Sequence, residues 1–404
     1  MKILMLSSTF PYPPSRGGTQ VRTFNLLKYL ARRHEVALVT QRSPDVTDEE
    51  VEALRCCVHR LAIFSRPEPS KKGMNFLGKA KRFGNFLLDG TPPNVRHSYS
   101  PAMQDWVDNY VEEGNCEAIT SEHSVNEIYV RPEWRQKLKT VVNIHSSVYA
   151  TCRQQLQSGT SSSPLRDRLQ LRLLRQYEQR YCTKFSGIVA TTEEDRRQFL
   201  ELNGSAEIVV IPNGVNFDRF PRRPKDPGGH KILFIGAMDN LPNIDAVRFF
   251  SEEVFPLLKL RYADATFTIA GARPVPEILE LQNIPGITVT GTVPSLTDYL
   301  HQATVCAIPM RTGYGIKNKT LEAMAAGVPV VASDRGLEGL AVDGPDVPLR
   351  AERANRIEEY VEAISRLFND SHLRTELSQQ GRSLIETEYT WETAGKRYER
   401  VLCE

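Results

Sequence analysis

The segment with the clearest chemical potential lies at residues 307–334, AIPMRTGYGIKNKTLEAMAAGVPVVASD. Lys317 and Lys319 stand in a glycine-containing loop directly before LEAMAA, which is a run of strong helix formers. A helix N-terminus presents free N–H groups with partial positive charge, and ammonium groups beside it add to the attraction for an anion. The pattern therefore predicts a phosphate site in which both lysines stabilise negative charge.

Glu322 follows on the expected first turn of this helix. A carboxylate repels phosphate but accepts hydrogen bonds from the hydroxyl groups of a sugar. Phosphate donors and a hydroxyl acceptor side by side suit a nucleoside diphosphate together with its ribose. The next residue with a clear structural purpose is Gly327, because a helix C-terminus favours a residue that can adopt left-handed backbone angles.

The elements that position these groups alternate between apolar strands and amphipathic helices, which predicts an α/β fold. The pattern starts at residues 2–6 and starts again, with a near-identical strand, at residues 231–235. The expected strands lie at residues 2–6, 35–40, 118–120, 140–144, 187–191, 207–211, 231–235, 266–270, 287–290, 305–308 and 328–332. The repetition predicts two Rossmann-like, doubly wound domains with a ligand site in the cleft between them.

A linker rich in proline, glycine and charged residues separates the two halves after residue 216. We therefore expect a first domain at residues 1–218 and a second at residues 219–390. The final helix, residues 391–404, is expected to pack back on the first domain.

The first strand ends in SSTFPYPPSRGG, a loop with Gly17-Gly18 at its close and a predicted helix at residues 20–33 behind it. Open α/β sheets bind ligands at the carboxyl ends of their strands, so this loop is expected to face a ligand, although a plain strand-to-helix turn is the alternative. Polar groups also end two later strands, at residues 120–123 and at Asn143 and His145. A single histidine is more often structural, and both interpretations of His145 stay open.

Composition narrows the classes of function. The chain has 404 residues and a formal net charge of +2, which argues against nucleic acid as the main partner. The sequence has no run of about 18 apolar residues, so we expect no membrane span. Seven cysteines without Cys-x-x-Cys spacing indicate neither a zinc site nor a disulfide framework, and a reducing cytoplasm is expected.

Two basic segments raise the possibility of peripheral contact with the inner face of a membrane. Residues 71–88 interleave lysines with phenylalanines and leucines, and residues 164–181 are rich in arginine with leucines at helical spacing. Such helices can lie on an anionic surface. The more common arrangement is a helix with one face on the core and its cations in water.

The chain as a whole resembles GT-B glycosyltransferases, specifically glycosyltransferase family 4. The resemblance is carried by the opening strand with Gly17-Gly18, IPNGVN at residues 211–216, LEAMAAGVPVVAS at 321–333 and GLEGL at 336–340. The run GYGIKNKTLEAMAAG also resembles sugar transferases of bacterial exopolysaccharide clusters. Members transfer a sugar from a nucleotide diphosphate sugar, usually with retention and without a metal.

The resemblance implies a hexosyltransferase that uses a UDP- or GDP-sugar and a saccharide or glycolipid acceptor, with no cofactor. Taken with the charge argument above, the resemblance makes His145, Lys317 and Lys319 the catalytic candidates. It assigns donor binding to Gly17, Gly18, Tyr314, Gly315, Ile316, Asn318 and Glu322. Within that set, Glu322 is expected to bind the ribose hydroxyls, and the backbone at residues 315–317 is expected to face the diphosphate.

Two features depart from the family pattern. The family has two glutamates separated by seven residues, and here Tyr314 occupies the first position while Glu322 occupies the second. The family often has an Arg and a Lys after the first strand of the second domain, whereas GAMDNLPNID at residues 236–245 has neither. Lys317, Lys319 or Arg311 are the candidate substitutes.

Three other classes of function compete with sugar transfer. A sugar-nucleotide epimerase of the same fold would bind the same donor but need no acceptor. A non-catalytic binding protein with a decayed site is suggested by Tyr314 but opposed by the intact Glu322 and the two lysines. A dinucleotide oxidoreductase is disfavoured because neither Gly17-Gly18 nor Gly236 supplies the Gly-x-Gly-x-x-Gly spacing.

Overall fold

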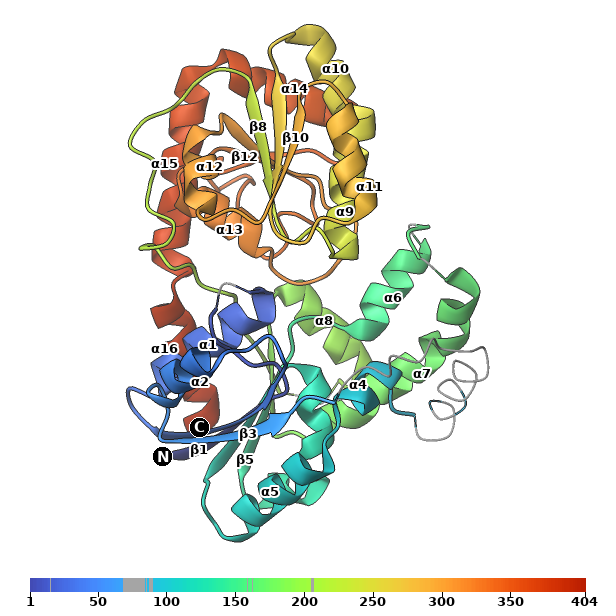
Figure 1. Cartoon of the computed structure of the whole chain (residues 1–404), viewed down its shortest axis with the longest axis vertical. Coiled ribbons are helices and arrows are strands. Elements are labelled where there is room, and N and C mark those ends of the chain that lie inside the picture. Colours follow the sequence, from blue (N-terminus) through green and yellow to red (C-terminus); the bar gives the residue numbers. More distant parts are fainter. Residues whose placement is uncertain are drawn as a thin grey trace. The chain divides into compact units, whose positions relative to one another are not determined.

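The computed structural model describes residues 1–404 except 15, 68–83, 85, 87–89, 158, 162 and 205–206. The chain forms two compact units (Figure 1). Unit 1 is Met1–Pro212 with Ala394–Glu404, and unit 2 is Asn213–Thr393. Each unit is a parallel β-sheet with helices packed on it, so the chain has the predicted α/β fold.

Unit 1 contains a seven-stranded sheet in the order β3-β2-β1-β4-β5-β6-β7, with every neighbouring pair parallel. The strands are β1 Lys2–Ser7, β2 Glu35–Arg42, β3 Arg60–Ser65, β4 Ala118–Glu122, β5 Lys139–Asn143, β6 Gly187–Ala190 and β7 Ile208–Val210. The strand order reverses between β1 and β4, and such a reversal is where a doubly wound sheet opens a crevice at its carboxyl edge.

The helices of unit 1 include one that returns from the end of the chain. They are α1 Gly18–Leu30, α2 Asp48–Arg55, α4 Pro93–Ser98, α5 Pro101–Glu112, α6 Val148–Gln157, α7 Pro164–Cys182, α8 Glu193–Leu202 and α16 Trp391–Cys403. Most of α16 belongs to unit 1 and lies beside α1 (Figure 1). The two helices approach so closely that a Cβ at Gly395 would lie 2.2 Å from the ring of Tyr29.

Unit 2 repeats the same topology with a six-stranded parallel sheet in the order β10-β9-β8-β11-β12-β13. The strands are β8 Lys231–Ile235, β9 Thr266–Ala270, β10 Ile287–Gly291, β11 Val305–Ile308, β12 Val330–Ala332 and β13 Glu352–Arg353. Here the order reverses between β8 and β11. The loops that follow these two strands are therefore the expected ligand-binding loops of unit 2.

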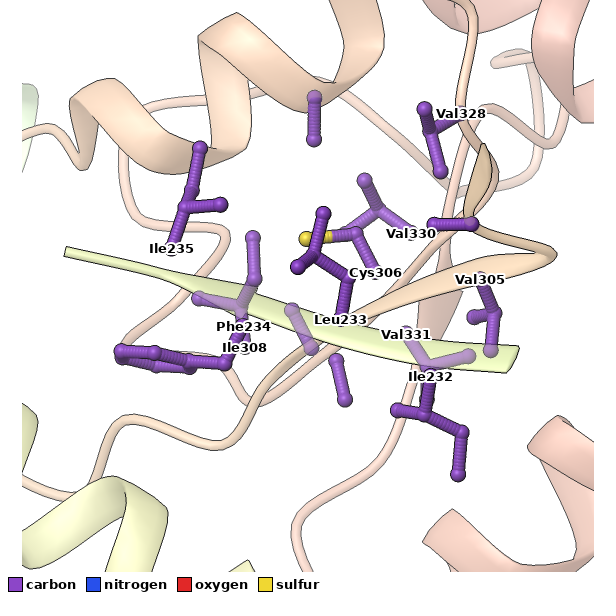
Figure 2. Close-up of a cluster of buried hydrophobic side chains, with 14 of the residues drawn as sticks. Ile232, Leu233, Phe234, Ile235, Val305, Cys306, Ile308, Val328, Val330 and Val331 are labelled. Atoms are coloured by element: carbon purple, nitrogen blue, oxygen red, sulfur yellow. The ribbon is translucent and has the colours of Figure 1, made fainter. Parts of the chain in front are cut away.

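Helices flank the unit 2 sheet on both sides (Figure 1). They are α9 Leu241–Phe249, α10 Phe255–Arg261, α11 Pro276–Leu279, α12 Leu296–Gln302, α13 Asn318–Ala325, α14 Ile357–Asn369 and α15 Ser371–Glu388. The apolar side chains of β8, β11 and β12 form a buried cluster between these layers (Figure 2). This core fixes the carboxyl ends of β8 and β11 as neighbours.

Several sequence-based expectations can be compared with these elements. The predicted central strands are confirmed, whereas the edge strands β3 and β13 were not predicted. Helix α7 is present at the predicted place and exposes Leu165 and Leu169 beside its arginines. Of residues 71–88, all but Gly84 and Phe86 lie outside the described residues. In the described part of the chain, no helix is both long and apolar enough to span a bilayer.

Candidate functional site

The predicted phosphate site lies at the strand-order reversal of unit 2. Residues 309–317 form the loop that connects β11 to α13, and this β11–α13 loop leaves the sheet next to the end of β8. Gly313 and Gly315 have φ angles of 90° and 82°, in the left-handed region that glycine adopts most easily. A residue with a side chain would be strained at either of these positions on the way to the N-terminus of α13.

Lys319 projects from the first turn of α13 toward the end of β8. Its ammonium group donates a hydrogen bond to the Asn243 side chain and lies 4.6 Å from the centre of the Phe234 ring. Burial, followed by the nearby charge of Lys317, lowers the pKa of Lys319 to about 7. Near neutral pH this amine is therefore poised between its charged and neutral forms.

Asn243 explains how the cation reaches this place. Its amide nitrogen donates to the Ala237 carbonyl oxygen at 2.8 Å, and its amide oxygen accepts from Lys319. The loop after β8 has no lysine or arginine between residues 236 and 245. Lys319 instead brings a positive charge to that loop from α13. Asn243 was not among the predicted residues, because it lies in the first turn of α9 and meets Lys319 only through the fold.

Lys317 is the N-cap residue of α13, with its ammonium group folded back on the loop. It donates to the Gly315 carbonyl oxygen and lies 3.6 Å from the Glu338 carboxylate. The ammonium group of Lys317 thereby places a positive charge beside the N-terminus of α13. The third candidate cation, Arg311, forms an ion pair with Asp245.

Glu322 requires a correction. Helix α13 begins at Asn318 rather than at Leu321, so Glu322 lies beyond the first turn. Tertiary contacts extend the helix backward: Asn318 accepts from Asn213 at 2.7 Å, and Thr320 Oγ1 donates to the Gly336 carbonyl oxygen at 2.7 Å. Burial raises the pKa of Glu322, and the charges of Arg219 and Lys319 oppose that shift.

The remaining predicted residues of unit 2 line the same loop. The Tyr314 ring stacks against the guanidinium of Arg335, 4.3 Å from the ring centre. Ile316 is buried and packs on the unit 2 core. The structure thus brings together seven of the predicted residues on one loop and one helix: Tyr314, Gly315, Ile316, Lys317, Asn318, Lys319 and Glu322.

In unit 1, the other predicted residues lie at the carboxyl edge of the sheet. Helix α1 begins at Gly18 with Gly17 as its N-cap, two residues before the predicted start of the helix and directly after the loop that leaves β1. Gly17 has no side chain with which to cap this end, so the first N–H groups of α1 suit an anion. The neighbouring Arg16 is engaged by Asp45 and Glu50.

His145 follows the end of β5, and its ring lies edge-on to that of His123, with centroids 4.9 Å apart. Burial, then the charges of His123 and Arg22, holds the pKa of His145 well below its usual range. Its Nε2 atom is buried and has no hydrogen-bond partner among the described residues. Burial therefore favours the neutral imidazole, whose Nε2 is a buried polar atom.

A buried polar network fixes the strand ends that carry the histidines. The Glu122 carboxylate accepts from Asn143 at 2.8 Å and from the Tyr398 hydroxyl of α16 at 2.6 Å. Arg22 of α1 donates to the Asn143 side-chain oxygen at 3.0 Å. The C-terminal helix is thereby tied to the candidate site of unit 1. Among the described residues, no group of three or more His, Cys, Asp or Glu side chains is placed to hold a metal ion.

Comparisons with known proteins assign this arrangement to a family. The family model described as Glycosyltransferase Family 4 matches residues 16–219, which is half of the chain. This chain belongs to glycosyltransferase family 4. A second model, described as Glycosyl transferases group 1, matches residues 229–370 in unit 2. Both halves of the chain are therefore glycosyltransferase domains, and the protein is a sugar-transferring enzyme by family.

Individual relatives agree with this membership. The phosphatidyl-myo-inositol mannosyltransferase of Mycolicibacterium smegmatis is 25% identical over 70% of each chain. The solved sucrose-phosphate synthase from Thermosynechococcus elongatus has a TM-score of 0.68 at 16% identity, over 99% of this chain and 98% of that one. Anabaena HepE, solved in complex with UDP-glucose, has a TM-score of 0.64 at 14% identity over 100% and 99%. These structural likenesses confirm the GT-B fold.

Proposed function

We propose that this enzyme transfers a hexose from a nucleoside diphosphate sugar to a hydroxyl group of a saccharide or glycolipid, with retention and without a metal ion. One observation carries the proposal: the N-terminus of α13, Lys317 and Lys319 converge at the strand-order reversal of unit 2. Helix N–H groups with two ammonium groups suit a diphosphate. The glycosyltransferase family supports the sugar as the group transferred.

The nucleoside is proposed to lie against α13, with its ribose hydroxyls donating to the Glu322 carboxylate. Glu322 is half-buried, one helical turn beyond Asn318 and close enough to interact electrostatically with Lys319. UDP and GDP are the proposed nucleotides. UDP is supported by HepE, a protein of the same fold that has been solved with UDP-glucose.

The chemistry we propose uses charge stabilisation at the leaving group. As the bond between the sugar carbon and the β-phosphate oxygen breaks, negative charge develops on the diphosphate, where Lys317, Lys319 and the helix N-terminus lower the barrier. The acceptor oxygen bonds to the same face of the sugar carbon and its proton passes to a phosphate oxygen. No protein carboxylate is then needed as a nucleophile.

Unit 1, taken by itself, carries groups that suit phosphate and sugar ligands. The uncapped N-terminus of α1 at Gly17 and Gly18 offers N–H donors for phosphate. His145 offers a neutral imidazole nitrogen for a sugar hydroxyl. Specificity for the acceptor is expected to reside in this unit.

The test is product analysis with UDP-glucose, UDP-N-acetylglucosamine and GDP-mannose, each incubated with and without a panel of oligosaccharide and glycolipid acceptors. Acceptor-dependent release of the nucleoside diphosphate, with the anomeric configuration of the donor kept in the product, supports the proposal. An epimerised sugar nucleotide formed without acceptor would replace it with an epimerase. Binding without turnover of any donor would favour a non-catalytic protein.

A further inference from the structure

The turn after β12 contains a buried acid that the proposed chemistry does not use. Only 3% of the Glu338 side chain is exposed. One carboxylate oxygen, Oε1, accepts a hydrogen bond from the Gly315 backbone N–H at 3.3 Å. The other, Oε2, lies 2.9 Å from an Arg335 nitrogen and 3.6 Å from Lys317 Nζ. This acid is therefore bound directly to the β11–α13 loop.

The same turn holds that loop at both ends. The Ser333 hydroxyl donates to the Met310 carbonyl oxygen at 2.5 Å, near the start of the loop. Thr320, in the first turn of α13, donates to the Gly336 carbonyl oxygen at 2.7 Å. Glu338 supplies the contact in the middle, where Gly315 has its left-handed backbone.

The contacts of Glu338 fix three groups of the candidate site together. The Gly315 N–H points to the carboxylate, while the Gly315 carbonyl oxygen accepts from Lys317. The ammonium group of Lys317 is thereby oriented between that carbonyl and the carboxylate. Arg335, which pairs with Glu338, stacks on the Tyr314 ring.

We propose that Glu338 is a positioning residue for the nucleotide site: it sets the loop conformation and the orientation of Lys317. This inference rests on the proposed function of the β11–α13 loop. The change in nucleotide affinity that it predicts for a neutral residue at position 338 is opposite in sign to the change that charge alone would cause. A negative charge beside an anion site weakens binding, so neutralising it would strengthen binding if position did not matter.

The test uses Glu338→Gln in the full chain, with Glu352→Gln as the matched control. Glu352 is a comparably buried acid of unit 2 that pairs with Arg366 at 2.8 Å; among the described residues it makes no ion pair with the loop. We expect Glu338→Gln to weaken UDP or GDP binding about tenfold, as when one charge-assisted hydrogen bond is lost. The double variant Glu338→Gln with Lys317→Ala should lose less affinity than the sum of the losses of the two single variants, because both substitutions act on one ammonium group.

A second measurement needs no ligand. Hydrogen–deuterium exchange of peptides covering residues 312–317 should quicken in Glu338→Gln and stay unchanged in Glu352→Gln. If the wild type binds UDP or GDP, and Glu338→Gln binds it equally well or more tightly with unchanged exchange at residues 312–317, the proposed role of Glu338 is wrong. The nucleotide site itself would stand. A wild-type protein that binds neither UDP nor GDP would instead overturn the nucleotide site, and this role with it.

Discussion

At the scale of single residues, Lys319 gives the site a titratable charge. Burial lowers its pKa from 10.5 to about 7, so the free protein loses this positive charge as the pH rises through neutrality. A diphosphate binds the ammonium form and raises its pKa again, so binding takes up a proton. Affinity should therefore be highest below pH 7 and fall, by at most about tenfold per pH unit, above it.

Calorimetric titration of the diphosphate between about pH 6 and pH 9 measures this slope. Lys319→Arg is the control, because a guanidinium stays charged over that range and the ionisation of the phosphate itself is the same for both proteins. The fall in affinity above pH 7 should be absent in the arginine variant. An equal slope in both proteins would show that Lys319 is not the titrating group.

The chemical residues of the site were only partly predictable from the sequence. Lys317 and Lys319 could be found because a loop and a helix N-terminus that are adjacent in sequence are adjacent in space. Asn243 meets Lys319 of α13, and Glu338 meets the β11–α13 loop, from segments beyond β8 and β12. A single sequence contains no signal for such tertiary pairs. Residues 236–245 contain no lysine or arginine. In the folded structure, Lys319 of α13 places its positive charge beside this segment, at Asn243.

At the scale of elements, the stability of helix α13 depends on the glycine that follows its last turn. Gly327 follows the helix with φ of 73°, and a Cβ there would lie 3.0 Å from Ser378 Oγ and 3.3 Å from Arg222 Cγ. Gly327→Ala should destabilise unit 2 by about 1–2 kcal/mol, the cost of a left-handed side-chain-bearing residue. Thermal unfolding measures the loss, and Gly204→Ala is the control, since its Cβ meets nothing nearer than 3.8 Å. Equal stability of both variants would contradict this account.

Sequence patterns found elements best where burial is complete. The strands β1, β5, β8 and β11 were recognisable as apolar runs because both faces of a parallel sheet are covered. Strand β3 is a half-buried edge strand with a mixed pattern, and β13 has only two residues, so neither produced a clear signal. The start of α13 was misplaced because tertiary hydrogen bonds to Asn318 and Thr320 outweigh local propensity.

At the scale of the whole molecule, the chain leaves unit 1 and returns to it through α16. The Tyr398 hydroxyl is buried and donates to Glu122 at 2.6 Å. Tyr398→Phe leaves the buried Glu122 carboxylate without one of its donors and should destabilise unit 1 by about 1–3 kcal/mol. Scanning calorimetry measures this loss. The control is Tyr262→Phe, because the Tyr262 hydroxyl accepts its hydrogen bond from Asn369 near the surface. Similar stability losses in both variants would contradict a special role for the α16 contact.

The measurement that tests the central claim most directly is ligand-induced stabilisation by UDP, GDP, ADP and CMP, with and without magnesium, on wild type and Glu322→Ala. At a hundredfold excess over its dissociation constant, a ligand adds about 2.7 kcal/mol to stability. The account predicts a clear shift with one nucleoside diphosphate, independent of magnesium and lost in the variant. No shift with any of the four would contradict a nucleotide-sugar site at the N-terminus of α13.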